Sequence, residues 1–307
     1  MTIDENKVAW ASDRLIGLAG IAAQDMPAGA LYVVATPIGN VADITLRALW
    51  VLAHADAIAA EDTRVTRALL ARYQIAAPEH GLFAAHAHNE RGVAQRIVAL
   101  LAGGARVALV TDAGTPAVSD PGARIVAAVR EAGHRVVPIP GPSSALAALS
   151  AAGFAEGGFR FIGFAPTGAK NRARMLSAAA ATGEAFVLFE APHRAAATLH
   201  ELAAMLAPER RVLVARELTK IHETLAVVAA GELGAWVDQH KPRGEYVIAV
   251  DTAADVAPTQ IDAITRRWLD ALADELPASR AAAVAAKATG LARDVVYAKL
   301  NARKGKI

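Results

Sequence analysis

One stretch of the chain, residues 106–122, limits strongly which folds this sequence can adopt. Residues 107–110 (VALV) form an unbroken aliphatic run, which is typical of a strand buried on both faces of a parallel sheet. A polar loop over residues 111–119 follows, in which Gly114 permits a left-handed backbone and Pro116 adds stiffness. Asp120 is then predicted to cap a helix that begins with Pro121. This order predicts a ligand site at the carboxyl end of a parallel sheet.

The same alternation of strand and helix recurs through the first half of the chain. Asp43 is predicted to cap a helix that ends near His54, and residues 145–152 form the last helix of this part. Strict alternation implies a parallel α/β sheet. We therefore predict an α/β domain over residues 31–155, preceded by a poorly ordered arm, residues 1–30. Its predicted strands are residues 31–35, 56–60, 81–85, 107–110 and 135–139.

The pattern changes after a cluster of glycine and small residues at 153–158. Two predicted strands are separated only by residues 218–222, which suggests a hairpin and hence a mixed sheet. We predict a second α/β domain over residues 156–255 and a small helix-turn-helix-like module over residues 258–307. The second domain's predicted strands are residues 159–164, 185–190, 211–216, 223–228 and 245–250, and the module's predicted helices are 261–276, 279–289 and 293–303.

Composition restricts the environment and the chemistry. The 307 residues include no cysteine, which excludes disulfides and thiolate metal sites and fits a reducing compartment. No apolar run is long enough to span a bilayer, and Asp4 and Glu5 argue against a secretory leader. We expect a soluble, cytoplasmic protein. A net charge of +2 permits contact with nucleic acid without indicating it.

Several common motifs of enzymes are absent or broken. Residues 163–170 (GFAPTGAK) resemble a phosphate-binding loop, but Ala169 breaks its spacing and Asn171 lacks the hydroxyl that magnesium requires. His86 and His88 have no further ligands nearby in sequence, so we expect no metal site. The dinucleotide, serine-hydrolase and zinc-protease signatures are also missing.

Four loops remain, and each follows a predicted strand of the first domain. Three of them are rich in glycine and proline and poor in lysine and arginine, which suits a nucleoside-like cofactor held by backbone groups and by shape. The loops are residues 36–40, 61–64, 111–119 and 140–144. Any one of them could be an ordinary turn, but four on one sheet edge favour a binding site.

Seven short motifs, four of which overlap these loops, occur in the order found in a known protein family. They are TPIGN at 36–40, AEDTR at 60–64, HNE at 88–90, TDAGTP with SDPG over 111–122, PGPS at 140–143, ARELTK at 215–220 and RGE at 243–245. They resemble the bacterial family of ribosomal RNA small subunit methyltransferases I, which belongs to the tetrapyrrole methylase superfamily. The resemblance implies a homodimer of two α/β domains with S-adenosylmethionine between them. It also implies 2′-O-methylation of a cytidine ribose in the decoding region of 16S rRNA in the small ribosomal subunit.

This resemblance also suggests roles for individual residues. A ribose hydroxyl needs a base during attack, and among Glu61, Asp62, His88, Glu90 and Glu217 we favour Glu61 or Asp62. Each of these residues has an alternative role as a helix cap or ion-pair partner. The predicted substrate contacts are Arg64, His88, Asn89, Glu90 and Lys220. The predicted cofactor contacts are Pro37, Asp112, Gly114, Pro116, Ser143, Ser144, Ala145, Leu188, Phe189, Glu190, Arg243 and Gly244.

Two alternative functions remain open at this point. The first is methylation of a small molecule such as a tetrapyrrole on the same fold. Enzymes of that kind usually begin with a different glycine-rich loop and lack the helical tail. The second is a non-catalytic RNA-binding or assembly factor that uses the basic tail, including Lys299 and Arg303.

Overall fold

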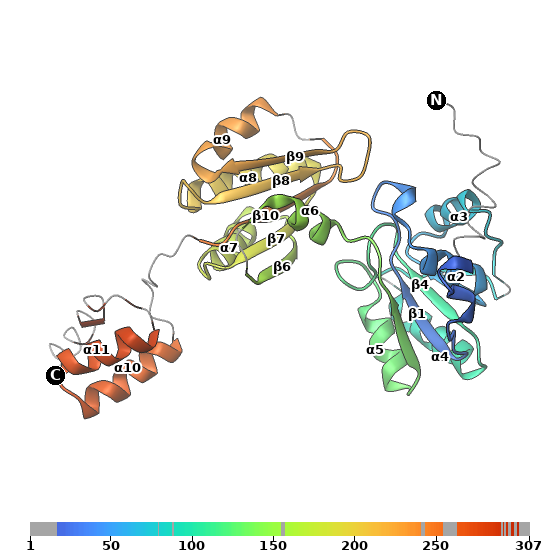
Figure 1. Cartoon of the computed structure of the whole chain (residues 1–307), viewed down its shortest axis with the longest axis horizontal. Coiled ribbons are helices and arrows are strands. Elements are labelled where there is room, and N and C mark those ends of the chain that lie inside the picture. The colour runs from blue at the N-terminus through green and yellow to red at the C-terminus, as the bar shows by residue number, and fades with distance from the viewer. Residues whose placement is uncertain are drawn as a thin grey trace. The chain divides into compact units, whose positions relative to one another are not determined.

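A computed structural model of the chain gives two compact units, Met1–Thr252 and Ala253–Ile307 (Figure 1). The structure describes residues 17–78, 80–87, 89–154, 157–240, 243–253, 263–289, 291, 293, 296–297 and 300. Residues 1–16 of the predicted N-terminal arm lie outside the described residues, whereas residues 17–30 are described and contain the short helix η1 (Ile21–Ala23). Each unit is described below by itself.

The first unit begins with a five-stranded parallel sheet in the order β3-β2-β4-β1-β5. This sheet confirms the parallel α/β architecture that the strand and helix alternation predicts. Its elements are η1 (Ile21–Ala23), β1 (Ala30–Val34), η2 (Val41–Asp43), α2 (Leu46–His54), β2 (Ala57–Ala60), α3 (Thr63–Arg72), β3 (Leu82–Ala84), α4 (Glu90–Ala102), β4 (Val107–Val110), α5 (Ala123–Glu131), β5 (Arg135–Ile139) and α6 (Ser144–Ala152).

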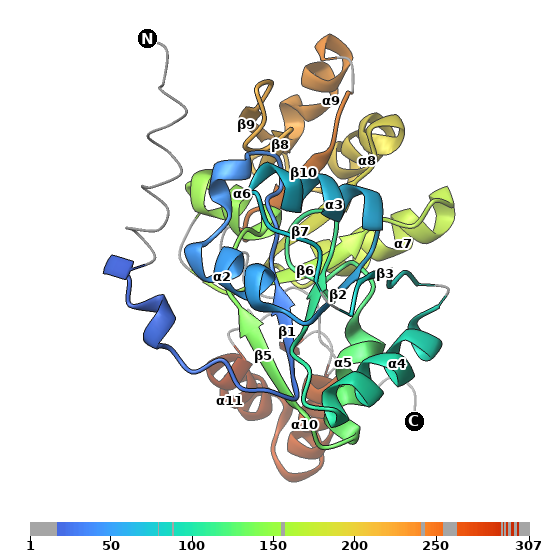
Figure 2. The same cartoon turned by 90° about the vertical axis from the view of Figure 1, so that its right-hand side faces the viewer.

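Helices cover both faces of this sheet, as the fully buried strand β4 requires. On one face, α2 packs Ala48, Val51 and Leu52 against the strands, because their spacing puts them on one side of the helix. On the other face, α4 and α5 lie next to each other and bury Ile97 and Ile125 (Figure 2). All the strands run the same way, so the loops after β1, β2, β4 and β5 meet at one edge.

The second sheet is mixed, with the strand order β6-β7-β10-β8-β9. Strands β6 and β7 are parallel, and the other neighbouring pairs are antiparallel. The predicted hairpin is the pair β8 and β9. The elements are β6 (Phe159–Phe164), α7 (Ala169–Ala180), β7 (Ala185–Glu190), α8 (Pro192–Met205), β8 (Arg211–Arg216), β9 (Thr224–Ala229), α9 (Ala230–Gln239) and β10 (Tyr246–Val250).

Helix α6 joins the two sheets in a way that the strand and helix pattern does not reveal. It follows β5 of the first sheet, yet its residues Ala145, Ala148 and Ala152 pack on the second sheet against Leu213 and Ala249 (Figure 1). Helices α7, α8 and α9 cover the opposite face of that sheet. A helix that belongs by sequence to the first half thus completes the core of the second.

Two predicted helix starts differ from the structure. Thr45, rather than Asp43, caps α2, because its hydroxyl accepts a hydrogen bond from the backbone N–H of Ala48 at 3.1 Å. Asp120 caps no helix, since α5 begins only after Gly122. The N–H of Gly122 is instead satisfied by the buried Glu90 carboxylate at 2.8 Å. Asp120 is therefore available for another role.

The second unit contains α10 (Ala263–Glu275) and α11 (Ala278–Thr289). Its core includes Leu269, Ala281 and Ala285, so the predicted pairing of two helices around Pro277 is confirmed. The third predicted helix, residues 293–303, lies mostly outside the described residues. Within the part of the chain that the structure describes, no helix has the length and apolar character needed to cross a membrane.

Candidate functional site

Backbone and side-chain hydrogen bonds tie together the loops at the carboxyl edge of the first sheet. Thr36 and Gly114 exchange two backbone hydrogen bonds of 2.9 and 3.0 Å, which joins the loop after β1 to the loop after β4. The Thr115 hydroxyl donates to the carbonyl of Pro142 at 3.1 Å and so adds the loop after β5. Gly114 has φ +84, a value that favours glycine. These loops form one fixed surface.

A cavity of about 400 Å³ lies beside this surface, within the range of small-molecule sites. Residues from both sheets form its walls. The lining residues are Ile38, Glu61, Thr111, Asp112, Ala113, Asp120, Ser144, Phe164, Phe189, Glu190, Ala191, Pro192, Leu218, Glu245, Tyr246 and Val247. Apolar walls and a group of carboxylates thus meet in one space.

Three of these carboxylates form a cluster around Thr111. The Thr111 hydroxyl donates to Glu61 Oε2 at 2.5 Å, and the backbone N–H of Asp112 donates to the same oxygen at 3.2 Å. Burial raises the pKa of Asp120, and the charge of Glu61 raises it further. Burial and then the charge of Glu61 likewise raise the pKa of Asp112. The cluster concentrates negative charge at one end of the cavity.

Asp62 lies next to this cluster but is held differently. It caps α3 by accepting from the backbone N–H of Arg64 at 2.8 Å. The Arg64 guanidinium also pairs with it at 2.6 Å. The side-chain hydrogen bond from Arg64 lowers the pKa of Asp62 to about 2. Asp62 is therefore a weak base with an evident structural role, and it is not among the residues that line the cavity.

The wall from the second sheet is built around Glu190. This carboxylate is fully buried and accepts from the Arg194 guanidinium at 2.7 Å, from the Thr198 hydroxyl at 2.6 Å and from the backbone N–H of Ala191 at 2.8 Å. Its charge is thereby compensated within the protein. Next to it, the ring of Phe189 meets the ring of Phe164 edge-on at 5.5 Å.

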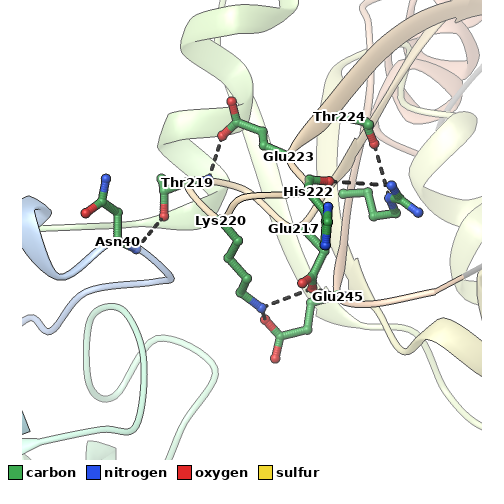
Figure 3. A network of polar contacts seen from close by, with 9 residues as sticks. Asn40, Glu217, Thr219, Lys220, His222, Glu223, Thr224 and Glu245 are labelled. Atoms are coloured by element: carbon green, nitrogen blue, oxygen red, sulfur yellow. Dashed lines mark hydrogen bonds and ion pairs between the residues drawn. The ribbon is translucent and has the colours of Figure 1, made fainter. Parts of the chain in front are cut away.

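A polar latch is made by residues 217–223 with Glu245 (Figure 3), and it contributes Leu218 and Glu245 to the lining of the cavity. Lys220 Nζ contacts Glu217 at 3.0 Å and Glu245 at 2.8 Å. Burial alone would lower the pKa of Lys220, but the hydrogen bonds to Glu245 and Glu217 outweigh burial and raise it. The latch touches the first half of the unit, since the N–H of Asn40 donates to the Thr219 hydroxyl at 3.0 Å.

The latch has an unusual backbone. Glu217 and Thr219 have φ +51 and +64 although neither is glycine, a conformation that costs energy and persists only where the surroundings enforce it. Leu218, between them, is buried and lines the cavity. The strained backbone therefore holds a wall residue in place.

The predicted cofactor residues divide into two groups in the structure. Asp112, Ser144, Phe189 and Glu190 line the cavity. The others lie outside its lining, and several of them support the loops or the core. These are Pro37, Gly114, Pro116, Ser143, Ala145, Leu188, Arg243 and Gly244. Leu188, for instance, points into the core beneath α7, α8 and α9.

The four predicted substrate residues that the structure describes have protein partners and do not line the cavity. Arg64 pairs with Asp62, and Lys220 pairs with Glu217 and Glu245. The Asn89 side chain bonds to the backbone of Ala84 and of His86. Glu90 is buried against Gly122, and His88 lies outside the described residues. Of the two predicted catalytic residues, only Glu61 lines the cavity.

Sequence reasoning missed several wall residues that come from strand ends or from within the motifs. Ile38 and Leu218 lie inside two of the seven motifs but have purely apolar side chains, and Glu245 lies in a third motif, in which Arg243 and Gly244 are the predicted contacts. The sequence pattern predicts a helix cap at Asp120, and Phe164 is the last residue of β6. Among the described residues, no three histidine or carboxylate side chains are placed to hold a metal ion.

Comparison with known families identifies the class of protein. The model of the Tetrapyrrole (Corrin/Porphyrin) Methylases matches residues 30–234, and that of the RsmI C-terminal HTH domain matches residues 259–304. The fold is also that of cobalt precorrin-4 methyltransferase, with a TM-score of 0.54, 18% identity and coverage of 74% of this chain and 98% of the other. The methyltransferase CobJ gives a TM-score of 0.52 at 24% identity, over 74% and 97% of the two chains.

Proteins that are similar over nearly the whole chain identify the family within this class. A protein from Neisseria meningitidis serogroup A named Ribosomal RNA small subunit methyltransferase I is 45% identical, over 90% of this chain and 94% of its own. The protein of the same name from Escherichia coli O157:H7 is 45% identical over 89% and 95%. The chain therefore belongs to the tetrapyrrole methylases and, within them, to the family of ribosomal RNA small subunit methyltransferases I.

Proposed function

We propose that this protein transfers a methyl group from S-adenosylmethionine to the ribose 2′-hydroxyl of a cytidine in the decoding region of small-subunit ribosomal RNA. The observation that carries the proposal is the 45% identity to a ribosomal RNA methyltransferase along 90% of the chain. The cavity supports it, because apolar walls and an acidic cluster suit a nucleoside ligand with a positive charge.

The residues of the cavity fit this cofactor. The rings of Phe164 and Phe189 with Leu218 offer an apolar surface for a base. The carboxylates of Glu61, Asp112 and Asp120 suit a cationic group and hydroxyl groups. No lysine or arginine is among the described lining residues, so the cluster favours a cation over a phosphate. When bound, S-adenosylmethionine supplies the activated methyl group.

The main contribution of the protein to the reaction is to position the two reactants. Methyl transfer is an in-line displacement, so the tied loops after β1, β4 and β5 keep the two reactants aligned and close. The apolar residues Ile38, Leu218 and Val247 exclude water from the cavity. The acidic cluster offers a carboxylate to receive the hydroxyl proton.

We propose that the second unit contributes contacts to the RNA. The second unit matches a helix-turn-helix model and exposes Trp268, an aromatic side chain on which a base can stack.

We also propose that the protein acts as a homodimer, as the family resemblance implies. Light scattering of the purified protein tests this, and a monomer at micromolar concentration would contradict it.

The test of the function is methyl transfer from radiolabelled S-adenosylmethionine to small ribosomal subunits from cells that lack the enzyme. Nucleoside analysis of the labelled RNA is expected to give 2′-O-methylcytidine, and mapping is expected to place it in the decoding region. Label in another nucleoside would overturn the cytidine assignment. Cofactor binding with no label in RNA would instead favour methylation of a small molecule, with a panel of tetrapyrroles as the next substrates.

A further inference from the structure

The cavity holds three neighbouring carboxylates that differ in how many hydrogen bonds the protein gives them. Glu61 Oε2 accepts from both the Thr111 hydroxyl and the Asp112 N–H. Asp112 Oδ1 accepts from the N–H of Asp62 at 3.1 Å. Asp120 lines the same cavity as the other two, and among the described residues the Thr111 hydroxyl is the one hydrogen-bonding group that acts on its side chain. A carboxylate with few donors keeps its lone pairs for a ligand.

Thr111 connects Asp120 to Glu61 through a single hydroxyl. That hydroxyl has one proton, which is directed to Glu61 at 2.5 Å, so toward Asp120 it can only accept. A second proton on the Asp120 side would complete the chain Asp120, Thr111, Glu61. The buried Thr111 is held in turn through its carbonyl, which accepts from the Thr36 hydroxyl at 3.0 Å. These three side chains can therefore take up one proton, on the carboxylate of Asp120.

We propose that Asp120 is the general base of the methyl transfer and that Thr111 positions it; this inference rests on the proposed function. The ribose oxygen forms a bond to the methyl carbon, and the carbon–sulfur bond breaks with its electron pair left on sulfur. The hydroxyl proton passes to the Asp120 carboxylate, which then donates to Thr111. The products are the methyl ether, a neutral thioether and protonated Asp120.

The surroundings of Asp120 make it better suited to act as the general base than the neighbouring carboxylates. The charged groups that act on it are Glu61, at the end of β2, and Asp112, in its own loop, and both are acidic. Burial and these charges raise its pKa, which makes it a stronger base than an ordinary aspartate. Asp62 is the contrasting case, because Arg64 stabilises its charge and weakens it as a base.

The test is the single-turnover rate of methyl transfer to unmethylated small subunits at saturating cofactor, measured from pH 5 to 9. Wild type is expected to lose activity as the pH falls through the raised pKa of Asp120. Asp120→Asn is expected to lower the rate by about 100- to 10,000-fold, the usual contribution of a general base, and saturating cofactor separates this loss from any change in cofactor affinity. Glu131→Gln, which changes an exposed carboxylate at the end of α5 and outside the cavity, is the control and is expected to match wild type.

A second variant separates the chemical role from a structural one. Thr111→Val keeps the shape of a buried residue but removes the hydroxyl that donates to Glu61 and can accept from protonated Asp120. Because protonated Asp120 loses its acceptor, the acid limb of the wild-type profile is expected to move to lower pH in this variant, which a merely structural effect would not produce. An unmoved limb in Thr111→Val, a wild-type rate in Asp120→Asn or a flat wild-type profile would each overturn the inference. Absence of RNA methylation by wild type would instead refute the proposed function.

Discussion

Asp62 and Asp120 are the same kind of residue in neighbouring loops, and their surroundings give them opposite properties. Asp62 accepts hydrogen bonds from Arg64 and remains ionised down to low pH. Asp120 is partly buried beside Glu61, which makes its ionised form costly. The surroundings of Asp62 stabilise a helix, and those of Asp120 suit a general base.

Asp62→Asn tests the structural role. The pKa of Asp62 is about 2 in the folded protein against an ordinary value of 3.8. Because the folded value is the lower one, ionised Asp62 stabilises the fold above the ordinary value, and this stabilisation is lost as pH falls toward 2. Urea denaturation between pH 5 and 2 is expected to show a shallower loss of stability in the variant. Methyl transfer at pH 7.5 should stay within about threefold of wild type; a loss beyond 100-fold would give Asp62 a catalytic role.

Asp120→Asn is expected to show the opposite dependence. A carboxylate whose pKa is raised by folding costs stability once the pH rises through that pKa. The neutral asparagine avoids this cost, so the variant should have a higher melting temperature than wild type at pH 8 and a smaller advantage at pH 4. Calorimetry at the two values measures the difference. A lower melting temperature at both would show that the carboxylate is needed for the fold.

Glu90 gives a third residue-level test, because its buried carboxylate serves the backbone N–H of Gly122. Glu90→Ala leaves that N–H without its partner and is expected to lower the free energy of unfolding by about 1–3 kcal/mol. Glu90→Gln keeps an acceptor oxygen and should cost less. Urea denaturation compares the two. If Glu90→Ala were as stable as wild type but failed to bind RNA, Glu90 would be a substrate contact after all.

Among the elements, the latch over residues 217–223 depends on the close approach of Gly39. A Cβ at Gly39 would lie 2.5 Å from Lys220 Cγ and 2.9 Å from the carbonyl oxygen of Leu218. Gly39→Ala is therefore expected to cost about 1–3 kcal/mol of stability and to raise the cofactor Kd, because Leu218 lines the cavity.

The control for this variant is a glycine at which an added Cβ would make only ordinary van der Waals contact. Gly234, inside α9, would place a Cβ no closer than 3.6 Å to the side chain of His200. Gly234→Ala is expected to gain about 0.5–1 kcal/mol from helix propensity and to leave cofactor binding unchanged. Chemical denaturation and calorimetric titration measure both quantities. Equal cofactor affinity in the two variants would show that the latch does not shape the cavity.

At the scale of the whole molecule, the chain divides after Thr252, and the second unit has an apolar core of its own. A chain that ends at Thr252 is therefore expected to unfold with the melting temperature of the first unit and to bind the cofactor with an unchanged Kd. Methyl transfer to small subunits should show a KM raised by about 10-fold or more, because RNA contacts are lost. Titration calorimetry and steady-state kinetics check the two parts. An unchanged KM would exclude the second unit from substrate binding.

Periodicity along the chain predicted much of this molecule. Strand β4 is four apolar residues between polar neighbours, and alternation with helices made a parallel sheet the natural outcome. The mixed second sheet followed from the short connection between β8 and β9. In these cases the preferences of neighbouring residues are enough, because secondary structure and buried faces depend mainly on local pattern.

Partners distant in sequence had to be learned from the tertiary structure. Glu90 rather than Asp120 serves the start of α5, and α6 packs on the second sheet although it follows the first. Lys220 is a predicted substrate contact in its motif, and in the fold it forms ion pairs with Glu217 and Glu245. A carboxylate acts as a cap, an ion-pair partner or a base according to its donors and its burial. Those depend on side chains far along the chain, which only folding brings together.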